Sequence, residues 1–99
     1  MATGKIRPAL IITRLPSDYS DWLVCMISSR TEQTISGIDD VISPSDDDFA
    51  DSGLRTESIV RVTRLAVVSD DIFLGLIGSI SAARLARLRS RLADWIVTG

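Results

Sequence analysis

Two side chains at the ends of neighbouring predicted strands are the best suited in this sequence to chemistry on a phosphate group. Arg7 precedes Pro8, which disfavours helix at Arg7 and leaves it extended where a strand begins. Ser28 lies at the end of the next predicted strand, followed by Arg30. Antiparallel pairing of these strands would place the start of one beside the end of the other. Two guanidinium groups and a hydroxyl would then form a phosphate site. The structural alternative is an arginine paired with an acid such as Glu32.

The sequence contains no histidine and a single cysteine, Cys25. The lack of histidine excludes Ser-His-Asp and Cys-His catalysis, histidine-based zinc sites and histidine acid–base pairs. One cysteine provides no disulfide framework. Any chemistry must therefore use arginine, serine, threonine, aspartate, glutamate or tyrosine side chains.

Acidic residues gather in segment 39–51, which contains six aspartates and no basic residue. We interpret the aspartate triplet structurally, with Ser45 as the N-cap of a helical turn and Asp46–Asp48 in its first turn, where the helix dipole favours negative charge. Gly53 is predicted to end this turn. The alternative is a magnesium-dependent nuclease built on the carboxylates of Asp39, Asp40 and Asp46–Asp48.

Short apolar runs rich in β-branched residues predict several strands that would hold these groups in place. The apolar stretch 72–80 is a further candidate strand, in which Gly75 and Gly78 suggest a bulge or a close backbone approach. The other predicted strands are 8–14, 22–28, 39–42, 58–62 and 65–68.

The last predicted element is an amphipathic helix over 82–97, capped by Ser81. We expect its apolar face to pack on the sheet and its basic face to be solvated; the alternative for the basic face is contact with a partner's acidic tail. Short strands that curl on themselves, closed by a terminal helix, predict a small α+β, mostly β, barrel. The apolar face carries Leu85, Leu88, Leu92, Trp95 and Ile96, and the basic face carries Arg84, Arg87 and Arg91.

The length of 99 residues and a composition of 45% hydrophobic and 24% charged residues predict one globular domain, residues 1–99. No apolar run approaches the roughly 20 residues of a membrane span, and the N-terminus lacks the apolar core of a signal peptide. Together with the single cysteine, this predicts a cytoplasmic protein. Ten of the eleven basic residues are arginine, which leaves open both a nucleic-acid-binding face and ordinary solvated side chains.

Four segments of the chain resemble, in order, the motifs of the PemK/MazF-type toxins. Residues 4–12, Gly-Lys-Ile-Arg-Pro-Ala-Leu-Ile-Ile, are similar to the family's G-x-x-R-P-[AV]-L-[VI]-[VI] segment. Residues 26–30 resemble its apolar strand ending in I-[TS]-[GS]. Residues 53–62 are similar to its G-L-x-x-x-S-V-V segment, and residues 74–81 to its closing L-G-x-[LI]-[GS]-x-L-S block.

The resemblance implies a small SH3-like barrel with a C-terminal amphipathic helix, a homodimer, and cleavage of single-stranded RNA without a metal or other cofactor. It also implies a bacterial, cytoplasmic toxin that a cognate antitoxin holds inactive. By position, Arg7 matches the family's catalytic arginine and Ser28 its catalytic hydroxyl residue, commonly threonine. Candidate RNA contacts are Arg30, Arg61, Arg64 and Glu32, of which Glu32 is also the nearest candidate for a general base.

The sequence departs from the family pattern at two places. Family members usually carry one more strand and a loop before the Arg-Pro motif, so we expect a barrel that lacks this first strand, either by trimming or by nature. Thr63 stands where some relatives have an acid that follows the arginine matched by Arg61. These departures keep a second hypothesis open, in which a toxin-like barrel binds antitoxin or RNA without cleaving it.

Overall fold

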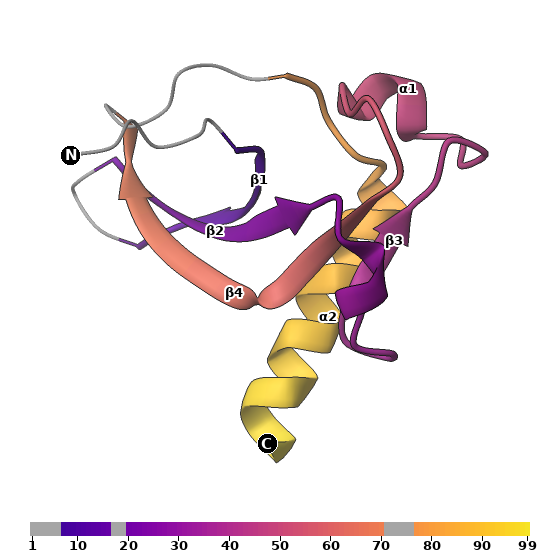
Figure 1. Ribbon diagram of the computed structural model, residues 1–99. Helices are drawn as coiled ribbons and strands as arrows, with labels where there is room; N and C mark the ends of the chain where they lie inside the picture. The colour runs from indigo at the N-terminus through magenta and orange to yellow at the C-terminus, as the bar shows by residue number, and fades with distance from the viewer. Residues whose placement is uncertain (1–6, 17–19, 71–76) are drawn as a thin grey trace, which may run out of the picture.

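The computed structural model describes residues 7–16, 20–70 and 77–99, which form a curled antiparallel sheet and a long C-terminal helix. Figure 1 shows the sheet bending around one side of the molecule while the helix runs beneath it. Within the described residues the strand order is β1-β2-β4-β3. The elements are β1 (Ala9–Arg14), β2 (Asp21–Ser28), the 3-10 helix η1 (Thr31–Gln33), β3 (Asp40–Ile42), α1 (Phe49–Ser52), β4 (Ser58–Ser69) and α2 (Ala82–Thr98).

The pairing of β1 with β2 is antiparallel, which is the arrangement that the phosphate site predicted from the sequence requires. Ala9 lies opposite Met26, and the ladder continues outward through a hydrogen bond from the Ile27 amide to the Pro8 carbonyl. This register puts Arg7, the residue before Pro8, at the level of Ser28. The start of β1 and the end of β2 therefore meet at one end of the sheet.

Strand β4 curls the sheet into a half-barrel. The predicted strands 58–62 and 65–68 are one continuous strand that pairs with β2 along its length. Met26 lies opposite Arg61, but its neighbour Cys25 lies opposite Leu65, so three residues of β4 have no partner at this point. Such a bulge bends a strand and increases its twist. The bend is visible in Figure 1 as the corner in β4, and the barrel-like α+β fold agrees with the prediction.

The core lies between the sheet and α2. Ser81 caps this helix as predicted, because its hydroxyl accepts a hydrogen bond from the Arg84 amide at 3.1 Å. The second half of the predicted apolar face does not enter the core, since Trp95 is 40% exposed and Ile96 64% exposed. The helix extends past the sheet there (Figure 1). The core cluster consists of Ile12, Cys25, Ile27, Ile42, Val60, Val62, Leu88 and Leu92.

The predicted solvated basic face of α2 is wrong in its first residue, since Arg84 is only 7% exposed. Its guanidinium binds both carboxylate oxygens of Asp48, at 2.8 and 2.9 Å, and single oxygens of Asp40 and Asp46. Arg87 and Arg91 on the same face also pair with Asp40. The basic face therefore neutralises the chain's own acidic segment, and we call Arg84, Asp40, Asp46 and Asp48 the arginine cluster.

The helical turn after the acidic segment begins later than predicted. Ser45 does not cap it; α1 begins at Phe49, and Asp48 at its N-cap makes no side-chain capping hydrogen bond. The carboxylates are used elsewhere, because Asp46 accepts a hydrogen bond from the Ser43 amide and Asp48 from the Ser81 amide. Gly53 ends α1 in the left-handed conformation, as predicted, with φ of 74°.

No part of the candidate strand 72–80 is confirmed by the structure. Residues 72–76, with Gly75, lie outside the described residues, and residues 77–80 lack regular structure. The expected close approach at Gly78 is present, since a Cβ there would lie 2.1 Å from the Asp51 carbonyl oxygen. This packing places the segment before α2 directly against α1. No helix in the described part of the chain is long and apolar enough to cross a membrane.

Candidate active site

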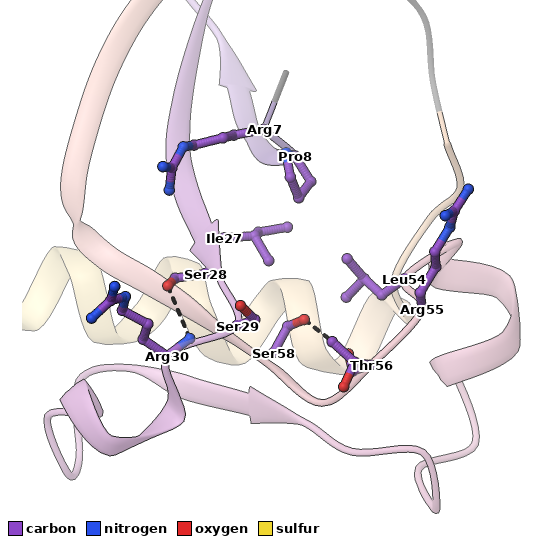
Figure 2. A pocket seen from close by; sticks show the side chains of 10 residues that line it. All are labelled: Arg7, Pro8, Ile27, Ser28, Ser29, Arg30, Leu54, Arg55, Thr56 and Ser58. Carbon is purple, nitrogen blue, oxygen red and sulfur yellow. Dashed lines mark hydrogen bonds between the residues drawn. The ribbon is translucent and has the colours of Figure 1, made fainter. Parts of the chain in front are cut away.

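A cavity of about 350 Å³ opens where β1 begins, β2 ends and the chain enters β4. The segments that line it differ in sequence position but meet through the strand pairing described above. We call this cavity the arginine pocket. Figure 2 shows its lining residues, which are Arg7, Pro8, Ile27, Ser28, Ser29, Arg30, Leu54, Arg55, Thr56 and Ser58.

The predicted meeting of Arg7, Ser28 and Arg30 is confirmed, since all three line the arginine pocket. In Figure 2 their side chains lie on the same side of the pocket. The alternative, an ion pair with an acid such as Glu32, is not formed, because neither Arg7 nor Arg30 makes a salt bridge within the described residues. Arg7 is exposed and its guanidinium is therefore accessible to an anion.

The orientation of the Ser28 hydroxyl is set by the loop that follows β2. Its oxygen accepts a hydrogen bond from the Arg30 amide at 3.1 Å (Figure 2). A hydroxyl has one hydrogen to donate besides its acceptor lone pairs. Because the Arg30 amide occupies one lone pair, the Ser28 hydroxyl hydrogen remains available for an oxygen atom in the pocket.

The charge of the arginine pocket is positive, since three arginines and no carboxylate are among its described lining residues. Four hydroxyl residues add neutral hydrogen-bonding groups, of which Ser58 is buried and donates to the Thr56 carbonyl at 2.9 Å. Arginine forks match the tetrahedral oxygens of a phosphate. The pocket is thus suited to a phosphate group with polar or apolar groups attached.

Three other candidate residues lie outside the lining of the pocket. Glu32 is exposed on η1, and Arg64 is exposed on β4. Arg61 is half-buried and donates through Nη1 to the Gln33 side-chain oxygen at 2.9 Å, while its buried Nε has no hydrogen-bond partner in the part of the chain that the structure describes. The structure therefore groups Arg7, Ser28 and Arg30 and separates Glu32 and the β4 arginines from them.

Sequence reasoning assigned no role to four polar residues that line the pocket, Ser29, Arg55, Thr56 and Ser58. Three of them follow Gly53 in the motif segment 53–62, which indicated a strand but no role for its polar residues. A glycine predicted to end a helical turn, followed by a polar stretch before an apolar β-branched run, was the signal available in the sequence. Loops that enter a strand in this way often carry functional groups on a rigid support.

The remaining reactive groups are poorly placed for chemistry. Burial, and secondarily the negative charge of Asp39, raises the pKa of the Cys25 thiol to about 12, so it is not a thiolate at neutral pH. Asp39 is itself buried and accepts hydrogen bonds from the Ile35 and Val62 amides. No group of three or more potential metal ligands occurs among the described residues. Of the aspartates of the alternative magnesium site, Asp40, Asp46 and Asp48 pair with an arginine, and Asp39 accepts the amide hydrogen bonds given above.

The comparisons with known proteins agree with this geometry at the level of the family. A family model described as PemK-like, MazF-like toxin of type II toxin–antitoxin system matches residues 2–96. The match spans nearly all of the 99 residues and includes every segment that lines the arginine pocket. Among curated proteins, the comparison found no match. The chain therefore belongs to the PemK-like, MazF-like toxin family of type II toxin–antitoxin systems.

Proposed function

We propose that this toxin cleaves single-stranded RNA in the arginine pocket, without a metal ion. One observation carries the proposal: the antiparallel register of β1 and β2 brings together, in one cationic cavity, an arginine and a serine hydroxyl, and within the described residues this arginine forms no salt bridge and this hydroxyl donates no hydrogen bond. Membership of the toxin family supports it, since the family implies an RNA substrate and an antitoxin partner.

In the proposed reaction the ribose 2′-oxygen attacks the adjacent phosphorus. The bond from the 2′-oxygen to phosphorus forms, the bond from phosphorus to the 5′-oxygen breaks, and solvent accepts the 2′ proton and supplies one to the 5′-oxygen. The products are a 2′,3′-cyclic phosphate and a 5′-hydroxyl end. Arg7 stabilises the negative charge that builds on the non-bridging oxygens, while Ser28 donates its hydrogen to one of them or orients the 2′-hydroxyl. The need for a 2′-hydroxyl makes the activity specific for RNA.

The direct test is cleavage of a single-stranded RNA by Arg7→Ala in the presence of EDTA. We expect wild type to cleave and the variant to lose a factor of about 10²–10³ or more, the usual effect of removing one such donor. Arg7 is exposed and makes no salt bridge within the described chain, so the fold should be unaffected. Arg87→Gln is the matched control, because it removes the same charge outside the pocket. Unchanged cleavage by Arg7→Ala, or wild-type cleavage that EDTA stops, would contradict the mechanism.

A second candidate function is a toxin-like barrel that binds RNA or antitoxin without cutting. The observation in its favour is that no carboxylate lines the pocket among the described residues, so none of them is placed as a general base. This alternative predicts RNA binding that depends on Arg7 but no cyclic-phosphate product. The homodimer and the cognate antitoxin remain expectations from the family, and sedimentation together with co-expression tests them.

A further inference from the structure

The arginine pocket is positively charged on two opposite sides. Arg7 and Arg30 lie on one side, beside Ser28, while Arg55 lies on the other, next to Leu54 (Figure 2). Arg55 comes from the segment between α1 and β4, so a different part of the chain holds it. It is exposed and makes no salt bridge within the described residues. An arginine without an acid at the rim of a cationic cavity is available to a second anion.

Between the two charged sides the lining is apolar and hydroxylic. Pro8, Ile27 and Leu54 lie in the middle of the pocket in Figure 2, with Ser29 and Thr56 below them. The cavity volume of about 350 Å³ lies within the range of roughly 300–1,000 Å³ found for small-molecule sites. The pocket thus presents a cationic side, an apolar surface with hydroxyls, and a second cationic side. This order matches the order of phosphate, nucleoside and phosphate along one RNA strand.

We propose that Arg55 binds a second phosphate of the same strand, so that the arginine pocket holds one nucleoside between two consecutive phosphates. The inference rests on the proposed function, since it assumes that Arg7 binds the phosphate that is cleaved. The nucleoside lies against Pro8, Ile27 and Leu54, and hydroxyls of the pocket contact its polar edge. Arg55 is then a substrate-binding residue, whose loss raises KM more than it lowers kcat.

The test measures binding of a 2′-O-methyl RNA of about ten mixed-sequence nucleotides, which cannot be cleaved, at several salt concentrations. Each phosphate contact adds about 0.7 to the slope of log K against log salt for a single strand. We expect Arg55→Gln and Arg7→Gln each to lower the slope by about 0.7, and the double variant by about 1.4. Arg87→Gln, which removes an equal charge outside the pocket, should leave the slope unchanged.

The result separates the two proposals. An unchanged slope for Arg55→Gln beside a lowered slope for Arg7→Gln overturns the role of Arg55 and leaves the proposed function intact. Unchanged slopes for both variants overturn both proposals. If all three variants lower the slope equally, the effect comes from long-range electrostatic attraction and not from direct phosphate contacts. This result also overturns the role of Arg55.

The spacing of one nucleotide is tested with the four nucleoside 3′,5′-bisphosphates, each compared with its two monophosphates by NMR titration. Wild type should bind at least one bisphosphate more tightly than either of its monophosphates. Arg55→Gln should bind that bisphosphate no better than one of the monophosphates. A wild type that does not distinguish bisphosphates from monophosphates overturns the one-nucleotide spacing.

Discussion

Replacing Arg84 with methionine should destabilise the protein more than any other change of a single charge on α2. Methionine has similar length and fills apolar space, but it removes five side-chain hydrogen bonds, four of them to carboxylates. The buried Asp48 then keeps only the Ser81 amide as a partner in this cluster. Removing one partner of a buried ion pair costs about 3–5 kcal/mol, because it leaves an uncompensated buried charge.

The size of this loss makes it easy to measure. Domains of this kind are stable by about 5–15 kcal/mol, so the variant loses a large part of its free energy of unfolding. With a urea m-value of about 2 kcal/mol/M, a loss of about 4 kcal/mol lowers the urea midpoint by about 2 M. Urea titration followed by circular dichroism is the assay. Arg87→Met is the matched control, because the Arg87 side chain is 45% exposed and its ion pair should contribute about 0–1 kcal/mol.

Equal decreases of the urea midpoint in Arg84→Met and Arg87→Met would refute a special contribution of the buried arginine. A second variant tests the assigned cause. Adding Asp48→Asn to Arg84→Met removes the uncompensated charge while retaining a similar shape, and should recover part of the lost stability. If the double variant is less stable than Arg84→Met alone, the cost does not come from the buried carboxylate.

Ser28→Ala should lower RNA cleavage by about 10²–10³-fold, while Ser28→Thr should retain most of the activity. An assay for the cyclic-phosphate product measures both variants, and equal activities of the two would exclude a catalytic role of the Ser28 hydroxyl. Gly78→Ala should cost about 1–3 kcal/mol in a thermal melt, because its Cβ would lie 2.1 Å from the Asp51 carbonyl oxygen. A hydrogen bond from the Ser43 amide, followed in size by one from Arg84, lowers the pKa of the Asp46 carboxyl. Hydrogen bonds from Arg84 lower the pKa of the Asp48 carboxyl. The stability that these two carboxylates contribute to the fold is present above the pKa of about 4 that they have in the unfolded chain, and it is lost as the pH falls below that value. The Tm should therefore drop between about pH 4 and pH 2, and it should drop less in Arg84→Met.

Local patterns in the sequence predict the elements that hold the pocket. β-branched runs identify β1, β2 and β4, and Ser81 with the leucine spacing identifies α2. Antiparallel pairing of consecutive strands is a general tendency, and it suffices to place Arg7 beside Ser28. The part of the site that these two strands build is therefore the part that the sequence predicts.

The incorrect predictions concern contacts between distant segments. Arg84 binds Asp48, 36 residues earlier, and this contact changes both ends: the helix face is buried, and α1 begins at Phe49 instead of after Ser45. Helix periodicity and capping rules describe neighbours in sequence, so they contain no information about such a pair. Arg55 was missed for the same reason, because its place opposite Arg7 depends on how the segment before β4 folds back.

The arginine cluster also determines when during synthesis the fold can form. Its acidic members lie in segment 40–48, but the arginine that neutralises them, and Leu88 and Leu92 that close the core, come from α2, 36 or more residues later in the chain. Until α2 has left the ribosome, the nascent sheet has an open apolar side and uncompensated carboxylates beside it. The fold therefore cannot form before α2 is synthesised, and a chain released before Arg84 has neither the core nor the buried ion pairs of the native protein.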